Sequence, residues 1–342
     1  VGNAVPRTLC TFHRQKTRRG KQSCARLPPY RGASGRGAAP RRRPHMHGAR
    51  RRPWEAHASD PTERSVSARG LAKARGTVED FVKSCFPLLG LPLEDVLAFG
   101  DVLYFVEASL YDADEANEAG ESASLGALYR FLDGRGLLDA AVREELDNGK
   151  RYWALEHDLV AAWRMPPAGP DEEDELLRTA QTALRLKSFD YRVLLLITLR
   201  LVGRRDDPAL LQLASSAFTL VEVEDDLKDY GADVASDAFN VYRAFTRRHR
   251  NDAPDRLLDW TRDLDAAYLD RRSEAKLDAQ VLAAHLARNE QQEGAGPAMA
   301  PLSGRWSPPP VVNDEATFRL VARASGSVPR LFHPASTQSP SL

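Results

Sequence analysis

Apolar residues recur at intervals of three and four along the middle of the chain, a spacing that places them on one face of an α-helix. The first such helix is predicted to begin after Thr77, a residue suited to N-capping, and to carry the apolar residues Val78, Phe81, Val82, Cys85, Phe86 and Leu89. Alternating strand patterns bounded by hairpin turns are absent. The pattern therefore predicts an all-α fold, with a single helical domain over residues 77–290.

Further helices are predicted to follow with short breaks between them. Two consecutive prolines at 166 and 167 end one of these helices, because proline removes a backbone donor and clashes with the preceding turn. The remaining predicted helices span residues 93–112, 124–132, 137–163, 171–186, 191–203, 208–230, 240–248, 254–270 and 274–289.

The two ends of the chain lack this pattern and are predicted to be disordered. Residues 1–70 form a basic arm rich in Arg, Gly and Pro, which cannot bury enough apolar surface to offset the entropy of ordering. Such an arm is typical of an organellar transit peptide or of a nucleic-acid patch. A third interpretation is that translation begins at Met46, the first methionine. Residues 294–342 are rich in Pro, Gly and Ser, and only 314–324 could form a short helix.

Charge divides the chain sharply. Fifteen of the 48 Lys and Arg residues precede Glu55, the first acidic residue, so the rest carries 33 basic against 48 acidic residues. An acidic domain makes nucleic acid an improbable partner, because phosphate attracts the opposite charge. No apolar run approaches the roughly 18 residues of a membrane span.

The cysteines suggest where the protein resides. The three cysteines show neither a disulfide framework nor metal-ligand spacing, which favours a reducing, intracellular compartment. A transit peptide would direct the protein to a plastid or mitochondrion, and without one we expect it in the cytoplasm.

One side of the predicted helix 208–230 changes from apolar to acidic along its length. At 100° per residue, the acidic set Glu222, Asp225, Asp226 and Asp229 lies opposite the leucines Leu213, Leu220 and Leu227. Two turns earlier the acidic side is apolar, with Leu211, Ala214 and Phe218. This change is typical of an apolar cavity with carboxylates at its rim, although a helix that leaves the core for solvent gives the same pattern. Because like charges at this spacing repel, a divalent cation such as Mg²⁺ would stabilise the acidic end.

The segment FTLVEVEDDLKDYGAD (218–233) resembles the second aspartate-rich motif of the class I isoprenoid (terpenoid) synthase superfamily, which includes prenyl diphosphate synthases and terpene cyclases. The resemblance implies an all-α bundle around an apolar cavity, with a Mg²⁺ cluster that holds a prenyl diphosphate substrate. By motif position, Asp225, Asp226 and Asp229 would be metal ligands. Such an enzyme ionises the diphosphate, either as a terpene cyclase or as a prenyltransferase.

The family also needs an upstream acidic motif and basic groups for the diphosphate. EASLYDADEANE offers Asp112, Asp114 and Glu115, which depart from the usual Asp-Asp-x-x-Asp pattern. Arginine suits a diphosphate because its planar fork binds two oxygens. The candidate arginines are Arg178, Arg192 and Arg243.

The irregular upstream patch favours a rival hypothesis, a non-catalytic helical binding or scaffold protein on the same fold. The sequence leaves open a homodimer.

Overall fold

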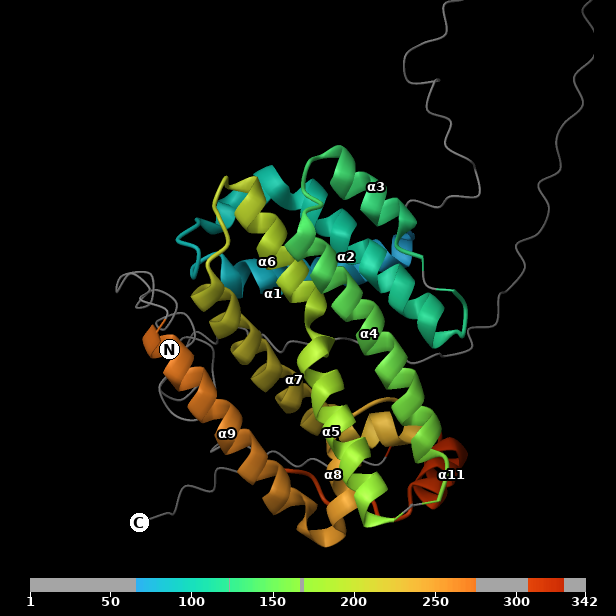
Figure 1. Ribbon diagram of the computed structural model, residues 1–342. Coiled ribbons are helices and arrows are strands. Elements are labelled where there is room, and N and C mark those ends of the chain that lie inside the picture. The colour runs from blue at the N-terminus through green and yellow to red at the C-terminus, as the bar shows by residue number, and fades with distance from the viewer. Residues whose placement is uncertain (1–65, 123, 167–168, 275–306, 329–342) are drawn as a thin grey trace, which may run out of the picture. The chain divides into compact units, whose positions relative to one another are not determined.

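A computed structural model of the chain describes residues 66–122, 124–166, 169–274 and 307–328, which belong to one compact unit (Figure 1). Every regular element in these ranges is a helix, which confirms the predicted all-α class. In chain order the elements are α1 (Ala68–Cys85), η2 (Leu93–Asp95), α2 (Val96–Glu118), α3 (Gly126–Gly134), α4 (Ala140–Trp163), α5 (Pro170–Lys187), α6 (Phe189–Leu201), α7 (Pro208–Ser236), α8 (Val241–His249), η3 (Arg250–Asp252), α9 (Ala253–Glu274) and α11 (Glu315–Ser325). The helix predicted over 274–289 lies almost entirely outside the described residues.

The first helix begins earlier than its apolar pattern indicates. The N-cap of α1 is Ser67, whose side chain accepts a hydrogen bond from the backbone of Gly70, so the prediction of Thr77 as the cap was wrong. Thr77 lies inside α1, where its hydroxyl is 2.7 Å from the hydroxyl of Tyr111 on α2. The helical domain therefore extends into the segment predicted as the basic arm, whose residues before Val66 lie outside the described part.

Helix starts follow local capping chemistry. The four N-terminal N–H groups of a helix lack partners within it, and Asp or Asn side chains supply acceptors. Asp139 caps α4, Asp207 caps α7 and Asn240 caps α8, each through its own side chain. At α5 the first helical residue is Pro170, which has no backbone N–H and so needs no acceptor, and acidic residues occupy the first turn.

The helices pack around α6, which is buried along almost its whole length. α6 packs against α1, α2, α4 and α7, while α9 runs along α7. In Figure 1, α1, α2 and α3 lie near the beginning of α4, whereas α8 and α11 lie near its end. The end of α4 therefore meets segments that are far from it in the sequence.

Part of the predicted tail belongs to the domain. Residues 307–328 include α11, which forms over most of the short segment predicted as helical and packs against α7. Tyr242 donates a hydrogen bond to the carbonyl of Pro309, and the backbone N–H of Val312 donates one to Tyr230. These contacts extend the domain beyond the predicted boundary at residue 290. The rest of the 294–342 segment lies outside the described residues.

Candidate functional site

The aspartate-rich stretch of α7 contacts the last residue of α5. The ammonium of Lys187 lies 2.7 Å from Oδ1 of Asp226 and 2.9 Å from Oε2 of Glu222. The hydroxyl of Ser188 donates to the other oxygen of Glu222 at 2.7 Å. The side chain of Asp226 is only 1% exposed and that of Lys187 11%, so this ion pair is largely removed from water. A lysine cation thus occupies the position between these two acids.

Asp226 also joins α7 to the start of α8. Its Oδ2 accepts a hydrogen bond from the backbone N–H of Val241 at 2.6 Å, one of the donors left unpaired at the helix N-terminus. The Asn240 side chain donates to the Asp226 carbonyl and, at 3.1 Å, to Asp233. Burial raises the pKa of Asp226 to about 6, although Lys187 acts in the opposite direction. The carboxylate of Asp226 therefore has a structural role at this junction.

Asp225 and Asp229 lie nearer the solvent than Asp226. The Asp225 side chain is 17% exposed, and its Oδ1 lies 3.7 Å from the ammonium of Lys228. Burial and then Glu222 raise the pKa of Asp225 to about 8, while Lys228 and Lys187 lower it. Asp229 is partly buried and has its own partner. The surroundings therefore favour the neutral form of Asp225 more than that of Asp226.

The apolar part of the same α7 side packs into the core. Ala214 and Phe218 are buried, and the Phe218 ring lies 5.2 Å from that of Tyr191 on α6. The opposite face is also packed as predicted, with its leucines Leu213, Leu220 and Leu227 buried. The change from apolar to acidic therefore coincides with the end of the α6 contact and the beginning of the α5 and α8 contacts.

The upstream acidic residues on α2 each have a different partner. Asp112 accepts hydrogen bonds at 2.5 Å from both the backbone N–H and the hydroxyl of Ser67, and so fixes the start of α1. Asp114 accepts from the indole N–H of Trp153 at 2.9 Å. Glu115 pairs with Lys73 at 2.6 Å and with Arg69 at 3.0 Å. These three acids hold α1 and α4 against α2.

The two acidic stretches are not brought together. α2 packs mainly against α1, α6 and α3, and α7 mainly against α9, α11, α5 and α8. Across the described ranges, no three His, Cys, Asp or Glu side chains are grouped so that they could hold a metal ion. In this arrangement Asp226 would bind Mg²⁺ only if Lys187 moved away. The donor set does not fit the Mg²⁺ cluster that the resemblance implies.

The three candidate arginines lie in different surroundings. Arg178 is exposed and pairs with Glu175 one turn earlier on its own helix. Arg192 is buried, bonded to Glu145 at 2.8 Å and to the carbonyls that end α5. Arg243 is buried beside a pocket at the end of α4. Of the three, Arg243 lies at a pocket that could admit a ligand.

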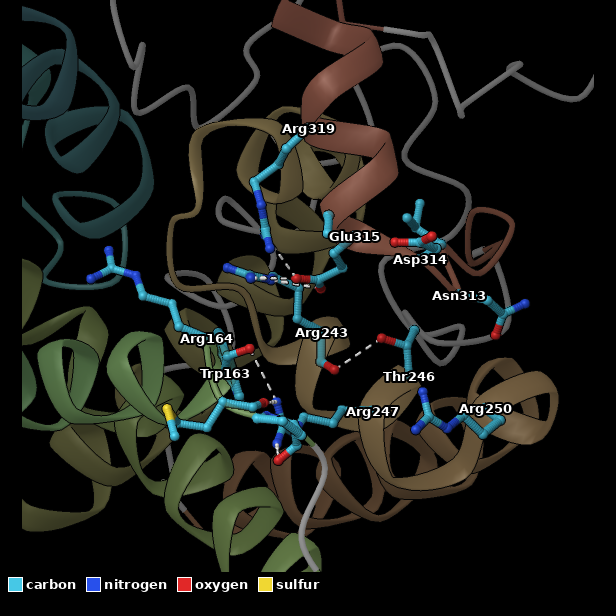
Figure 2. Close-up of a pocket in the computed structure, with 14 residues that line it drawn as sticks. Trp163, Arg164, Arg243, Thr246, Arg247, Arg250, Asn313, Asp314, Glu315 and Arg319 are labelled. Carbon is cyan, nitrogen blue, oxygen red and sulfur yellow. Dashed lines mark hydrogen bonds and ion pairs between the residues drawn. The ribbon is translucent and has the colours of Figure 1, made fainter.

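A pocket of about 370 Å³ lies where α4 ends, between α8, η3 and α11 (Figure 2). We call it the arginine pocket, because its walls carry five guanidinium groups against two carboxylates. The arginines are Arg164, Arg243, Arg247, Arg250 and Arg319, and the acids are Asp314 and Glu315.

Three of these arginines share two acidic partners. Nη2 of Arg243 lies 2.6 Å from Glu315 and 3.0 Å from Asp237, which ends α7. Arg319 reaches the same two acids through Nη1, at 3.0 and 3.2 Å. Arg164 donates to Asp237 through Nε at 2.9 Å. This cluster holds α11 against the end of α7 and carries one more positive than negative charge.

Arg247 uses most of its donors within the fold. Both oxygens of Glu173 lie within 2.9 Å of its Nε, and its Nη groups donate to the carbonyls of Trp163, Met165 and Pro166. Arg247 therefore fixes the turn after α4 and balances a buried acid. It lines the arginine pocket with four of its five N–H groups engaged in these bonds.

Two donors of the arginine pocket lack partners among the described residues. The side chain of Arg250 is exposed and has neither an ion pair nor a hydrogen bond there, although its backbone N–H donates to the carbonyl of Thr246. The indole Nε1 of Trp163 is buried without a hydrogen bond. The Trp163 ring stacks on the Phe239 ring, with 5.8 Å between the ring centroids. The Arg243 guanidinium lies over the Trp163 ring, 4.7 Å from its centroid.

Sequence reasoning selected only Arg243 from this set. The run RRHR at 247–250 was a usable signal, since two of its arginines line the pocket. The sequence carries no comparable signal for the pocket residues at the end of α4 and on α11, because their position depends on long-range packing.

Comparison with protein-family models, with curated proteins and with solved structures finds no match to this chain. Among the described helices, none combines the length and the apolar character needed to cross a membrane.

Proposed function

We propose that this protein is a non-catalytic helical binding or scaffold protein, in which the aspartate-rich stretch of α7 stabilises the fold. The observation that carries the proposal is the ammonium of Lys187, which lies within 2.9 Å of both Glu222 and Asp226. A metal site needs carboxylates that are available to the cation. Here a side chain of the chain itself supplies the positive charge.

The further contacts of Asp226 support the same proposal. One oxygen accepts from Lys187 and the other from the backbone of Val241, so both oxygens are used within the fold. A buried carboxylate that lost these donors would carry a large desolvation cost. Binding Mg²⁺ through Asp226 would therefore require breaking the junction between α7 and α8.

A second candidate function is the Mg²⁺-dependent class I isoprenoid synthase, acting on a prenyl diphosphate. It is favoured by Asp225, a partly exposed carboxyl with a pKa of about 8, next to Glu222 and one turn before Asp229. A cation bound there would relieve the repulsion that contributes to this pKa.

Thermal unfolding with and without Mg²⁺, pyrophosphate and chelator separates the two candidates. A ligand that binds only the native state raises the melting temperature. For a binding or scaffold protein, we expect Mg²⁺ to have the same effect on the melting temperature of wild type, Asp225→Asn and Asp229→Asn. A magnesium-dependent rise that both variants abolish would refute the first candidate and support the second.

A direct activity assay is the second test of the two candidate functions. We expect the folded protein to release no diphosphate from C10, C15 or C20 prenyl diphosphates in the presence of Mg²⁺. Metal-dependent release that Asp225→Asn eliminates would establish the enzyme instead. The exposed Asp158→Asn on α4 is the matched control, since it removes one carboxylate elsewhere.

A further inference from the structure

We propose that the arginine pocket binds a small phosphorylated molecule without a metal ion. This inference goes beyond the proposed function, which names no ligand, and it uses none of the acids predicted to bind Mg²⁺. The volume of about 370 Å³ falls in the range of small-molecule sites and leaves room for more than a single phosphate group.

The charge of the arginine pocket favours an anion. The cluster around Arg243 has one uncompensated positive charge, and Arg250 adds another. On the rim, Asp314 is the opposing charge; hydrogen bonds from Thr317 hold the pKa of Asp314 below its ordinary value. The positive charge of the arginine pocket therefore exceeds its negative charge, and one of the excess charges is on the exposed Arg250.

Unused donors surround this space from different elements. Arg250 comes from η3, Arg319 from α11 and Arg164 from α4. Arg319 uses only Nη1, and Arg164 only Nε, for contacts with described residues. In Figure 2, Arg319 and Arg250 lie on different sides of Arg243. Donors that approach from several directions match a tetrahedral phosphate better than a planar carboxylate, and guanidinium groups bind phosphate oxygens in pairs.

The buried indole of Trp163 gives an independent reason to expect a polar ligand. Its Nε1–H is a donor without a partner in the described structure, and a buried donor that makes no hydrogen bond is destabilising. Trp163 lines the arginine pocket and is 7% exposed. An acceptor oxygen that reached this donor would recover the cost.

The backbone at Arg250 fixes where its side chain begins. Its φ of 55° lies in a region that residues with a Cβ rarely adopt. Strain of this kind persists where surrounding structure holds it, and it recurs at ligand sites. Here it ends α8 and turns the chain into η3 at the edge of the arginine pocket.

Isothermal titration of the full chain in chelator tests the site, with inorganic phosphate, pyrophosphate and glycerol phosphate as probes. Arg250→Ala removes an exposed side chain without partners, so the fold should be kept. Because hydrogen bonds to charged groups contribute about 1.5–3 kcal/mol, we expect the dissociation constant to rise at least about tenfold. Arg205→Ala is the matched control, an exposed arginine with no described partner outside the arginine pocket.

Trp163→Phe tests the indole donor separately, because it keeps a ring between Phe239 and Arg243. We expect a roughly threefold to tenfold loss of affinity. Loss of affinity in Arg250→Ala alone would still support the pocket, whereas equal losses in Arg250→Ala and Arg205→Ala would show unspecific attraction and overturn it.

Binding to lipid vesicles tests whether the phosphate group belongs to a small soluble molecule or to a lipid headgroup. Phosphatidylcholine vesicles with and without phosphatidic acid present the same group on a lipid. Binding of the soluble probes alone supports a small metabolite, while vesicle binding that Arg250→Ala abolishes would assign the group to a lipid headgroup and overturn the small-molecule proposal. No binding of any probe overturns the site. Magnesium-dependent binding that Asp225→Asn removes would instead contradict the proposed function. The arginine pocket is tested separately, by whether Arg250→Ala weakens binding in chelator.

Discussion

Replacing Lys187 by methionine tests the structural role of the acidic stretch on α7 most directly. The substitution keeps an unbranched side chain of similar length but removes the ammonium between Glu222 and Asp226. Both acids then stay buried without their nearest cation, which lies 2.9 and 2.7 Å away in the wild-type structure. We expect a marked loss of stability.

The magnitude follows from the burial of the pair. Removing one partner of a buried ion pair costs about 3–5 kcal/mol, because an uncompensated charge remains. For a domain of this size, such a loss lowers the melting temperature by on the order of 10 °C. Burial already raises the pKa of Asp226 to about 6, and the loss of Lys187 removes the main opposing influence. Asp226 will therefore become neutral more readily, so the cost should be largest near pH 8 and smaller near pH 5.

Urea unfolding followed by circular dichroism at about pH 5 and pH 8 measures both effects. Lys228→Met is the matched control. It removes the same group from an i,i+4 pair with Glu224 and from a longer contact of 3.7 Å with Asp225. Lys228 and Glu224 are more exposed than Lys187 and Asp226, so Lys228→Met should cost less than Lys187→Met. If Lys187→Met is no more destabilising than Lys228→Met near pH 8, the buried acids do not need Lys187, and the structural interpretation of the stretch is refuted.

Two other predictions concern Asp225 and Gly149. Since burial raises the pKa of Asp225 from its ordinary 3.8 to about 8, folding takes up a proton between these values, and the free energy of unfolding falls as the pH rises through them. Asp225→Asn should therefore be more stable than wild type in urea titrations near pH 7, by at most roughly 4 kcal/mol, and equal to it near pH 4; a constant difference would contradict this pKa. Gly149→Ala should cost about 1–3 kcal/mol in the same assay, because a Cβ would overlap the buried Phe189 ring. Gly76→Ala is the control: its Cβ would meet no atom, and alanine favours a helix more than glycine does, so this variant should gain about 0.5–1 kcal/mol. An equal loss in both variants would contradict the overlap with Phe189.

The order of the helices was predictable because apolar periodicity and proline breaks act locally. The start of α1 was not, since residues 68–77 contain few apolar positions and two glycines. Their helix is fixed instead by Asp112, which binds Ser67 from 45 positions away. A Cβ at Gly70 would collide with the same Asp112, so the close approach of α1 to α2 also depends on that glycine. Sequence patterns carry no signal for a contact of this range.

The candidate site was predictable as far as helix geometry determines it. A helical projection correctly separates the buried leucines of α7 from its acids, but it cannot say what lies opposite each acid. Asp225 and Asp226 are adjacent in the sequence, yet one is partly exposed and the other is enclosed by Lys187 and Val241. Those partners come from α5 and α8, and their approach depends on the packing of three helices. Neighbouring acids therefore acquire different surroundings and different pKa values.

The resemblance to an aspartate-rich motif and the helix junction have a common physical origin. A metal ion and a helix N-terminus both attract carboxylate oxygens, since both present positive charge. Between α7 and α8 only a short turn intervenes, so the N–H groups that open α8 must find acceptors on the helix just completed. Asp226 accepts from the N–H of Val241, and the side chain of Asn240 accepts from the N–H of Tyr242 while its amide donates to Asp233. An apolar run followed by clustered acids can thus arise wherever a core helix turns back into another. What separates the two cases is the cation within reach of the acids, and for Asp226 it is Lys187, 2.7 Å away.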